Sequence, residues 1–245
     1  AVYAAMVDRV DRNIGRIADA REKKSILDNT LIIFLSDNGG CAETVRSGPR
    51  AMEIQTTRDG RPMRFGCRED MEPGAPDTFM SYDLPWANAS NSPFRRFKHW
   101  VHEGGISTPF IAYWPRTIAG GAIRHEAAHV IDIVATLYDV ADASPPAEIA
   151  GRPALRPEGE SFAALLHGRS WRRERPIGWE HEGNAAWRDG RLKLVRRHDQ
   201  NGWELYNMDA DRTELNNLAA RYPEKVKLLA AAYGDWADRC GVLPF

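Results

Sequence analysis

Two short stretches of the 245-residue chain hold side chains whose types and spacing suit metal or anion chemistry. In the first, Asp37 and Asn38 directly follow five consecutive apolar residues, 31–35. A carboxylate beside an amide carbonyl offers two hard oxygen ligands, the type that Ca²⁺ or Mg²⁺ prefers. Gly39 and Gly40 come next, and glycine allows both a sharp turn and the close approach of a ligand. The same residues also fit a plain turn, because Asn-Gly is a strong turn dipeptide.

The second stretch, residues 94–105, interleaves basic and aromatic side chains and ends on a Gly-Gly pair. Lys98 within it is a point charge suited to an oxyanion if it is held at the edge of a strand. His99 and His102 flank the same turn, and His181 follows a predicted strand much later in the chain. All three histidines are candidates for binding a substrate. The alternatives are a solvated basic hairpin at residues 94–105 and a surface turn at His181.

The apolar run at 31–35 anchors the predicted fold. It shows no alternation of polar and apolar residues, which predicts a short strand buried on both faces and flanked by parallel neighbours. In open α/β sheets functional groups gather where the chain leaves the carboxyl end of a strand. Residues 2–24 repeat apolar side chains every three or four positions, which predicts an amphipathic helix before this strand. A second strand is expected at 110–114, bounded by prolines.

A helix is expected at 129–140, and its apolar residues should form the buried face. His129 and Asp132 are expected to be exposed or to cap the helix rather than to bind a ligand. The residues expected on the buried face are Val130, Ile133, Val134 and Leu137.

Residues 41–97 lack periodicity but carry several aromatic side chains, which predicts an ordered excursion that lines a cleft. A Pro- and Ala-rich linker follows at 143–156. We therefore divide the chain into residues 1–150 and a smaller subdomain at 151–245. In the latter we expect a short helix at 161–167, strands at 176–180, 192–196 and 204–208, a hairpin turn at Asp189-Gly190 between the first two strands, and a closing helix at 223–239.

Composition limits the function classes. The formal net charge of −1 gives no argument for a nucleic acid or an anionic membrane as partner. No unbroken run of apolar residues, the five at 31–35 included, approaches the roughly 18 or more that a membrane helix needs. The three cysteines are odd in number and widely spaced, so they predict neither a disulfide framework nor a zinc site, and the compartment stays open.

Three motifs in a fixed order resemble the C-terminal part of a type I sulfatase, of the arylsulfatase kind, in the alkaline-phosphatase-like superfamily. The first is the apolar strand followed by Asp-Asn-Gly at 31–40. The second is Lys98 followed by Glu-Gly-Gly at 103–105, with Pro109 and Trp114-Pro115 downstream. The third is Glu204-Leu205-Tyr206-Asn207 with Asp211, Glu214, Asn217 and Leu218.

This resemblance implies an α/β fold: the C-terminal portion of a mixed, mostly parallel sheet sandwiched by helices, plus a small antiparallel-sheet subdomain with a closing helix. It implies that Asp37 and Asn38 bind a catalytic Ca²⁺, with Mg²⁺ the second choice. Lys98 would hold a sulfate oxygen and offset charge on the leaving group. The implied reaction is metal-assisted hydrolysis of a sulfate ester, on a small molecule or a sulfated glycan, and a periplasmic or secreted location fits the family.

The chain departs from the family at the nucleophile. In that family the nucleophile is a formylglycine made from Cys or Ser in a Cys/Ser-x-Pro/Ala-x-Arg motif. In this chain none of Cys41, Cys67 and Cys240 lies in such a motif. We therefore expect a fragment whose partner is an N-terminal part of the same enzyme, which carries the formylglycine. Alone, it should be catalytically inactive, bind Ca²⁺ weakly and associate through exposed apolar surface.

Two rival functions remain open from the sequence. One is a phosphodiesterase or phosphonate hydrolase of the same superfamily. The lysine with Glu-Gly-Gly favours a sulfatase over these hydrolases, because a lysine suits a monoanionic sulfate ester. The other is a non-catalytic module or relic that binds a sulfated ligand through Lys98, Arg95 and Arg96.

Overall fold

The computed structural model describes residues 1–45 and 55–245. The described chain divides into two compact units. The first comprises residues 1–20, 36–109 and 211–215, and the second comprises residues 21–35, 110–210 and 216–245. The part of the expected 41–97 excursion at 46–54 lies outside the described residues.

The first unit contains most of α1 (Val2–Glu22), the helix expected at 2–24. Its apolar stripe is exposed: Met6 and Val10 are 63% and 47% accessible. The expected excursion is ordered in its described parts. It holds the parallel strand pair β2 (Arg64–Phe65) and β3 (Thr78–Phe79), followed by α2 (Asp83–Asn91), and α3 (Glu103–Ile106) comes after it.

The second unit contains the anchoring strand β1 (Ile32–Leu35), which follows the short helix η1 (Leu27–Asn29). β1 pairs antiparallel with β4 (Phe110–Tyr113), with Leu35 opposite Phe110. The expectation of burial on both faces is wrong, because all four residues of β1 are half-buried. A ladder of two strands gives β1 one neighbour, which is too little cover to bury either face. Within the described residues its partner strand is antiparallel rather than parallel.

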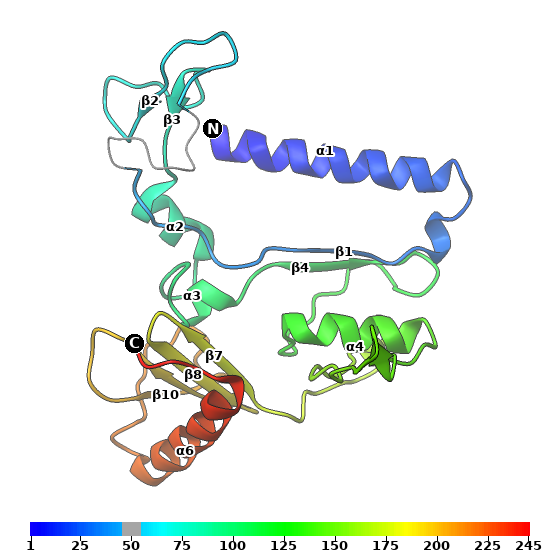
Figure 1. The fold of residues 1–245 in the computed structure, drawn as a ribbon, viewed down its shortest axis with the longest axis vertical. Coiled ribbons are helices and arrows are strands. Elements are labelled where there is room, and N and C mark those ends of the chain that lie inside the picture. The colour runs from blue at the N-terminus through cyan, green and yellow to red at the C-terminus, as the bar shows by residue number, and fades with distance from the viewer. Residues whose placement is uncertain (46–54) are drawn as a thin grey trace. The chain divides into compact units, whose positions relative to one another are not determined.

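A four-stranded antiparallel sheet forms the main core of the second unit. Its strands are β7 (Ile177–His181), β8 (Asn184–Asp189), β9 (Leu192–Arg196) and β10 (Glu204–Asn207), paired in the order β10-β9-β8-β7. The closing helix α6 (Pro223–Cys240) lies across this sheet (Figure 1). The closing helix expected at 223–239 is confirmed, and its apolar residues face the sheet: Leu229 and Tyr233 are buried against Leu194 and Leu205, and Trp236 packs beside them.

The sequence analysis missed β8, which the Asp189-Gly190 turn joins to β9. The segment expected to end at a surface turn after His181 is instead a tight hairpin at Glu182-Gly183, both with positive φ. β8 begins Asn-Ala-Ala-Trp, and its first four residues are buried. Two alanines carry little strand propensity, so burial rather than local preference makes this segment a strand.

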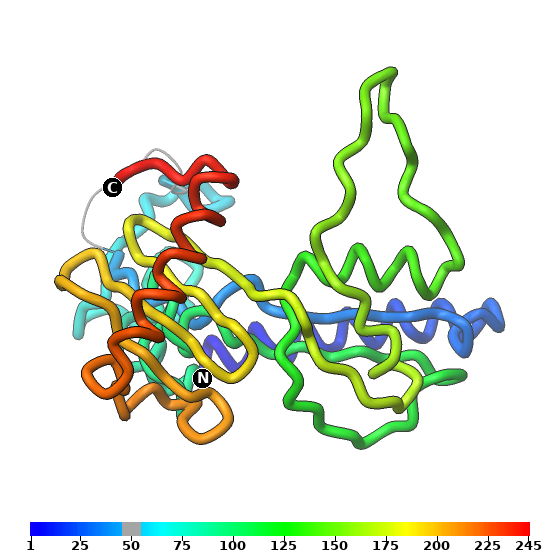
Figure 2. Tube along the Cα trace, turned by 90° about the horizontal axis from the view of Figure 1, so that it is seen from below, coloured from blue at the N-terminus to red at the C-terminus, as the bar shows by residue number. Residues whose placement is uncertain are grey.

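The expected linker also contains structure. Two short strands, β5 (Glu148–Ile149) and β6 (Arg152–Pro153), form an exposed antiparallel hairpin. Figure 2 shows this segment projecting from the second unit. Ala150 and Gly151 at its tip both have positive φ, the geometry of a type I′ hairpin turn. The domain boundary placed near residue 150 stays a prediction.

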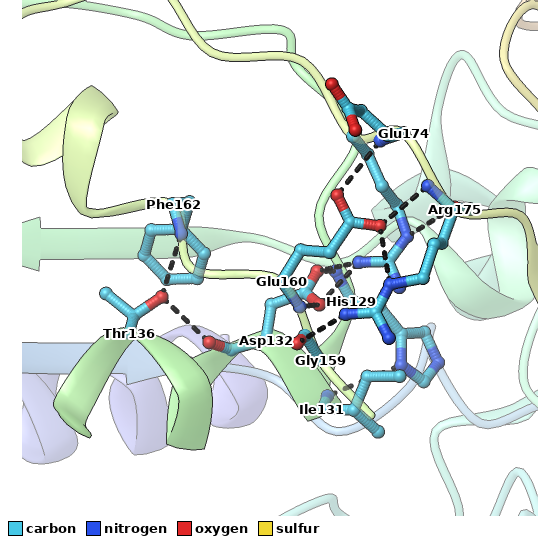
Figure 3. A network of polar contacts seen from close by, with 10 residues as sticks. His129, Ile131, Asp132, Thr136, Gly159, Glu160, Phe162, Glu174 and Arg175 are labelled. Carbon is cyan, nitrogen blue, oxygen red and sulfur yellow. Dashed lines mark hydrogen bonds and ion pairs between the residues drawn. The ribbon is translucent and has the colours of Figure 1, made fainter. Parts of the chain in front are cut away.

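The helix expected at 129–140 is α4 (Val130–Val140), but the expected buried face is wrong. Val130, Val134 and Leu137 are exposed, whereas Asp132 and Thr136 are fully buried. The reason is a polar network that the hydrophobic pattern does not report. Asp132 accepts hydrogen bonds from the backbone N–H groups of His129 and Glu160, and Thr136 Oγ1 accepts one from Phe162 (Figure 3). The capping role expected for His129 and Asp132 is confirmed, since the two form a capping box.

The helix α5 (Ala163–Leu166) accounts for the short helix expected at 161–167. Its Ala163 and Leu166 are buried, and the preceding Phe162 packs edge-on against Phe110 with ring centroids 5.7 Å apart. This contact ties α5 to strand β4 within the second unit.

Candidate functional site

Two turns of the first unit, 36–40 and 95–105, lie side by side and are joined through their backbones. The Gly39 N–H donates to the Gly105 carbonyl at 3.0 Å, and the Lys98 N–H donates to the Gly40 carbonyl at 3.0 Å. The candidate metal ligands and the candidate sulfate-binding lysine, which are distant in sequence, therefore belong to one local structure.

The glycines of both turns are required by this close contact. A Cβ atom on Gly39 would lie 1.9 Å from the carbonyl oxygen of Gly104. A Cβ atom on Gly105 would lie 1.9 Å from the carbonyl oxygen of Trp100. No side chain fits at such distances, so Gly39 is needed where the two turns meet, and Gly105 is needed for the path of the 95–105 turn itself.

Asn91, the last residue of α2, fastens the two turns together. Its Oδ1 accepts a hydrogen bond from the Gly40 N–H at 2.9 Å, and its Nδ2 donates to the Arg96 carbonyl at 3.1 Å. The sequence analysis did not single out this residue. Asn91-Ser92-Pro93 reads only as a turn, and no local pattern signals a contact to a distant glycine.

Asp37 and Asn38 can supply oxygen ligands to a cation. Asp37 is exposed, and its carboxylate forms no hydrogen bond or ion pair with any described residue. The Asn38 side-chain amide donates to the Gly39 carbonyl at 2.8 Å, which commits its nitrogen and leaves its oxygen as the acceptor. Two neighbouring hard oxygens fit part of the set of six to eight that Ca²⁺ takes.

Lys98 is held by its backbone and presents its ammonium group at the surface. The side chain is 38% accessible, and its Nζ lies 3.5 Å from the exposed carboxylate of Glu43. A surface ion pair of this kind is worth little, so it does not commit the ammonium group. Arg96 and His99 on either side have φ of +71° and +91°. Non-glycine residues adopt such conformations where surrounding structure imposes them, often at functional sites.

The three candidate histidines differ in their surroundings. His99 is half-buried in the Lys98 turn, with its ring edge-on to Trp100 at 5.1 Å between centroids. His102 is fully buried at the start of α3, so its ring presents no exposed surface in this structure. His181 is exposed at the end of β7 in the second unit. Their roles in substrate binding stay predictions.

Glu103 and Glu214 support the Lys98 turn from beneath, and both are buried. Glu214 Oε2 accepts the Glu103 N–H at 2.8 Å, and the Arg95 guanidinium donates to the Glu214 carbonyl at 3.0 Å. Arg212 bonds both the Glu103 carboxylate at 3.3 Å and the Ser107 hydroxyl at 2.9 Å. These positioning roles were not foreseen, although Glu214 belongs to the third motif that suggested the family.

Comparisons with known proteins identify the family of this chain. The family profile described as Sulfatase matches residues 1–143, and the profile described as N-sulphoglucosamine sulphohydrolase, C-terminal, matches residues 94–231. The chain belongs to the sulfatase family. The resemblance drawn from the three sequence motifs is thereby confirmed, and so is the mixed α/β fold class.

Two curated sulfatases illustrate the relationship. The uncharacterized sulfatase PB10D8.02c of Schizosaccharomyces pombe is 33% identical over 99% of this chain and 44% of its own length. The arylsulfatase of Klebsiella aerogenes is 30% identical over 67% of this chain and 34% of its own length. The chain thus spans less than half the length of these sulfatases.

A solved structure of a protein in complex with its substrate, D-glucosamine-2-N,6-O-disulfate, has a similar fold. It superposes with a TM-score of 0.57 at 21% identity, over 95% of this chain and 39% of the other. Among the described residues of the sulfatase chain, no helix is both long enough and apolar enough to cross a membrane.

Proposed function

We propose that this chain supplies part of the metal-binding and sulfate-binding machinery of an enzyme that hydrolyses a sulfate ester. The observation that carries the proposal is the backbone pairing of the Asp37-Asn38-Gly39-Gly40 turn with the Lys98 turn. This pairing supports the proposal, because it joins the turn that carries the two candidate oxygen ligands directly to the turn that carries Lys98.

Each side chain has a definite task in this proposal. Asp37 and Asn38 offer oxygens to a divalent cation, for which we propose Ca²⁺. When bound, such a cation acts as a Lewis acid on a sulfate oxygen. Lys98 donates hydrogen bonds to another sulfate oxygen and stabilises the charge that develops on the leaving group. These are positioning and electrostatic tasks, as in phosphoryl transfer.

No cysteine of this chain lies in the sequence motif that the formylglycine nucleophile requires. Cys41, Cys67 and Cys240 are free thiols outside a Cys-x-Pro/Ala-x-Arg motif, so we derive no step through a formylglycine here. We propose that the nucleophile is supplied by another part of the whole protein.

For the substrate we propose a sulfated sugar or an aryl sulfate. The arylsulfatase relative and the structure with a disulfated glucosamine support these two classes. A periplasmic or secreted location is proposed from the family resemblance alone.

The rival function is a non-catalytic module that binds a sulfated ligand. The contacts of two of its three proposed ligand-binding residues, Arg95 and Arg96, speak against this function. Arg95 donates to the Glu214 carbonyl, and Arg96 stacks on Trp100 at 4.6 Å, so both guanidinium groups serve the fold.

The coding sequence upstream of residue 1 separates the two functions. A Cys/Ser-x-Pro/Ala-x-Arg motif there supports the enzyme, and a start codon close to Ala1 supports the binding module.

Activity tests the role of Lys98 directly. In the product of the natural gene, Lys98→Ala should lower kcat/KM for an aryl sulfate by about 10²–10³-fold, the usual effect of removing one charge-stabilising donor. Lys24→Ala, which removes an exposed lysine beyond α1, is the matched control. A Lys98→Ala enzyme with the parental rate would contradict the proposal, and faster turnover of a phosphonate ester than of any sulfate ester would favour the related hydrolase.

A further inference from the structure

The second unit contains a cavity of about 320 Å³ that the sulfate-binding proposal does not use. No residue of the 36–40 or 95–105 turns lines it. Five arginines contribute to its walls: Arg172, Arg173, Arg175, Arg188 and Arg191. Only two acidic side chains, Glu126 and Asp209, appear among the described lining residues. The walls are therefore predominantly cationic.

Two of the five arginines are fixed by buried acids of the α4 network. Arg173 forms an ion pair with both carboxylate oxygens of Asp132, and its side chain is only 7% accessible. Arg175 bonds Glu160 at 3.2 Å and the Gly159 carbonyl at 2.9 Å (Figure 3). These contacts make one wall of the cavity rigid.

The Glu160 carboxylate, which holds Arg175 in this wall, stays ionised. Burial alone would raise its pKa, but the backbone N–H groups of Glu174 and Arg175 and the charge of Arg173 lower the pKa below its ordinary value. Glu160 is therefore ionised at neutral pH, and its charge largely neutralises the Arg175 guanidinium, as the ion pair with Asp132 does for Arg173.

The other wall carries guanidinium groups with spare donors. The guanidinium groups of Arg172 and Arg191 form no ion pair or hydrogen bond with any described residue, and both residues are exposed. The Arg172 guanidinium lies over the β8–β9 turn, 3.1 Å from where a Cβ of Gly190 would be. Arg188 reaches the same turn, since its Nε donates to the Gly190 carbonyl at 3.2 Å. The guanidinium groups of Arg172 and Arg188 thus lie at one short turn, and Arg191, the residue after that turn, also lines the cavity.

Trp171 adds an apolar surface to this cationic cavity. Its ring is half-buried and packs edge-on against Phe162, with 6.4 Å between ring centroids. An indole held in this way offers a face on which the C–H groups of a sugar ring can pack. The volume is at the small end of the roughly 300–1,000 Å³ range of ligand sites, which suits one sugar unit.

We propose that this cavity binds a sugar that carries a sulfate or carboxylate group. Arg172 and Arg191 grip the anionic group, because a guanidinium fork matches the paired oxygens of sulfate or carboxylate. Trp171 packs against the sugar ring. The proposal concerns binding alone and does not depend on hydrolysis at Lys98.

Titration of the 245-residue chain with glucose 6-sulfate, glucuronate, glucose and inorganic sulfate tests the proposal, with calorimetry as the measure. Glucose 6-sulfate and glucuronate should bind, and glucose should not. Weaker binding of inorganic sulfate would show that the sugar ring contributes, whereas equal binding of inorganic sulfate would overturn the role of Trp171.

Arg172→Gln combined with Arg191→Gln should weaken binding by at least about tenfold, since each removes charge-assisted hydrogen bonds. The matched control is Arg152→Gln with Arg156→Gln, which removes the same charge from exposed positions of the same unit. Neither pair removes a contact of the fold, and Arg191→Gln alone provides a milder second variant. If the control variant loses the same amount of binding affinity, the loss comes from the change in net charge rather than from the cavity, and the proposal is overturned.

The location of binding is read from the Trp171 indole signal in NMR spectra, identified by its disappearance in Trp171→Phe. The signal should shift on titration, and the shift should persist in Lys98→Ala. Binding lost in Lys98→Ala but kept in the arginine variants would place the anion at Lys98 and overturn the cavity. If Lys98→Ala abolishes hydrolysis but keeps sugar binding in the cavity, the result bears on the proposed catalytic role of Lys98 and leaves the cavity proposal standing.

Discussion

Gly39 and Gly105 decide whether the two functional turns can meet. A Cβ atom on Gly39 would lie 1.9 Å from the Gly104 carbonyl oxygen of the facing turn, and one on Gly105 would lie 1.9 Å from the Trp100 carbonyl oxygen of its own turn. A carbonyl oxygen within a hydrogen-bonded turn cannot move aside as the end of a flexible side chain can. The shape of the site therefore depends on two missing side chains as much as on Asp37 or Lys98.

Gly39→Ala should destabilise the protein by about 3 kcal/mol or more, because the added methyl group must push two backbones apart. Gly15→Ala is the control, since Gly15 lies within α1 with nothing near its Cβ position. That change should stabilise the helix by about 1 kcal/mol. Urea unfolding measures both, and a Gly39→Ala protein as stable as the parent would show that the turns are not in contact.

Asp37→Ala should weaken binding of Ca²⁺ at least about tenfold while leaving stability nearly unchanged, because the carboxylate is exposed and bonds no described residue. Terbium luminescence or calorimetry on the 245-residue chain measures the affinity. Asp235→Ala removes an equally exposed carboxylate from α6 and should have no effect on binding. Equal loss in both variants would indicate diffuse charge attraction rather than a site.

At the scale of elements, α4 is organised by polar contacts. Its buried side is Asp132 and Thr136, and the Asp132 carboxylate bonds the N–H groups of His129 and Glu160 as well as the Arg173 guanidinium. This one carboxylate therefore ties the start of α4 to the 159–175 segment. The same segment supplies part of the wall of the arginine cavity.

Asp132→Ala should cost about 3–5 kcal/mol of stability, because it leaves the Arg173 charge buried without its partner. The contrast is Glu158→Ala, which breaks an ion pair to Arg239 whose side chains are 57% and 55% accessible. That loss should be at most about 1 kcal/mol. Denaturant unfolding compares the two, and similar values would mean that the α4 network is not buried in solution.

Acid should weaken the start of α4 through His129. Burial chiefly lowers the pKa of His129, and the Arg173 charge adds to this against the opposing effect of Asp132. The unfolded chain then binds a proton more readily than the folded one, so stability falls as the pH drops below about 6.5. The loss is complete once the pH is below the lowered pKa of the folded state.

His129→Asn keeps a good helix-capping residue but removes the titration. Stability of the parent should therefore fall more steeply than that of His129→Asn between about pH 7 and pH 5. His125→Asn, at an exposed position, should follow the parent. Parallel curves for the parent and His129→Asn would show that His129 titrates normally in the folded protein.

At the scale of the whole chain, apolar surface remains uncovered on several elements. Met6, Val7, Val10 and Ile17 of α1 are exposed, as are three of the four residues of β4 and the outer side of α4. Contiguous apolar faces of this kind are association sites in soluble proteins. The prediction that the chain associates therefore has a structural basis in named side chains.

Met6→Glu with Val10→Glu should lower the apparent mass of the chain at a fixed concentration, because it places two charges on the apolar face of α1. Light scattering after gel filtration measures the mass over a range of concentrations. Leu155→Glu changes an isolated exposed leucine of the β6 region and should leave the mass unaltered. A parent chain that stays monomeric and unfolds cooperatively would contradict the prediction.

The sequence by itself determined the family, the mixed α/β class, the longest helices, five of the ten strands in the described part of the chain, and the two candidate turns. It could do so because the signals are local. Each signal is contained within one short segment of the sequence. Examples are the apolar run before Asp37, the Gly-Gly pairs, and the spacing of Leu229, Tyr233 and Trp236.

Only the tertiary structure decided how distant residues combine. Asn91 joins the two turns, Glu214 supports the Lys98 turn, and Asp132 turns the polar side of α4 inward. The alanines of β8 form a strand because the sheet buries them. A hydrogen bond between residues far apart in sequence leaves no periodic trace in either segment. The physical reason is that such contacts depend on where the folded backbone brings each group, which local propensity does not encode.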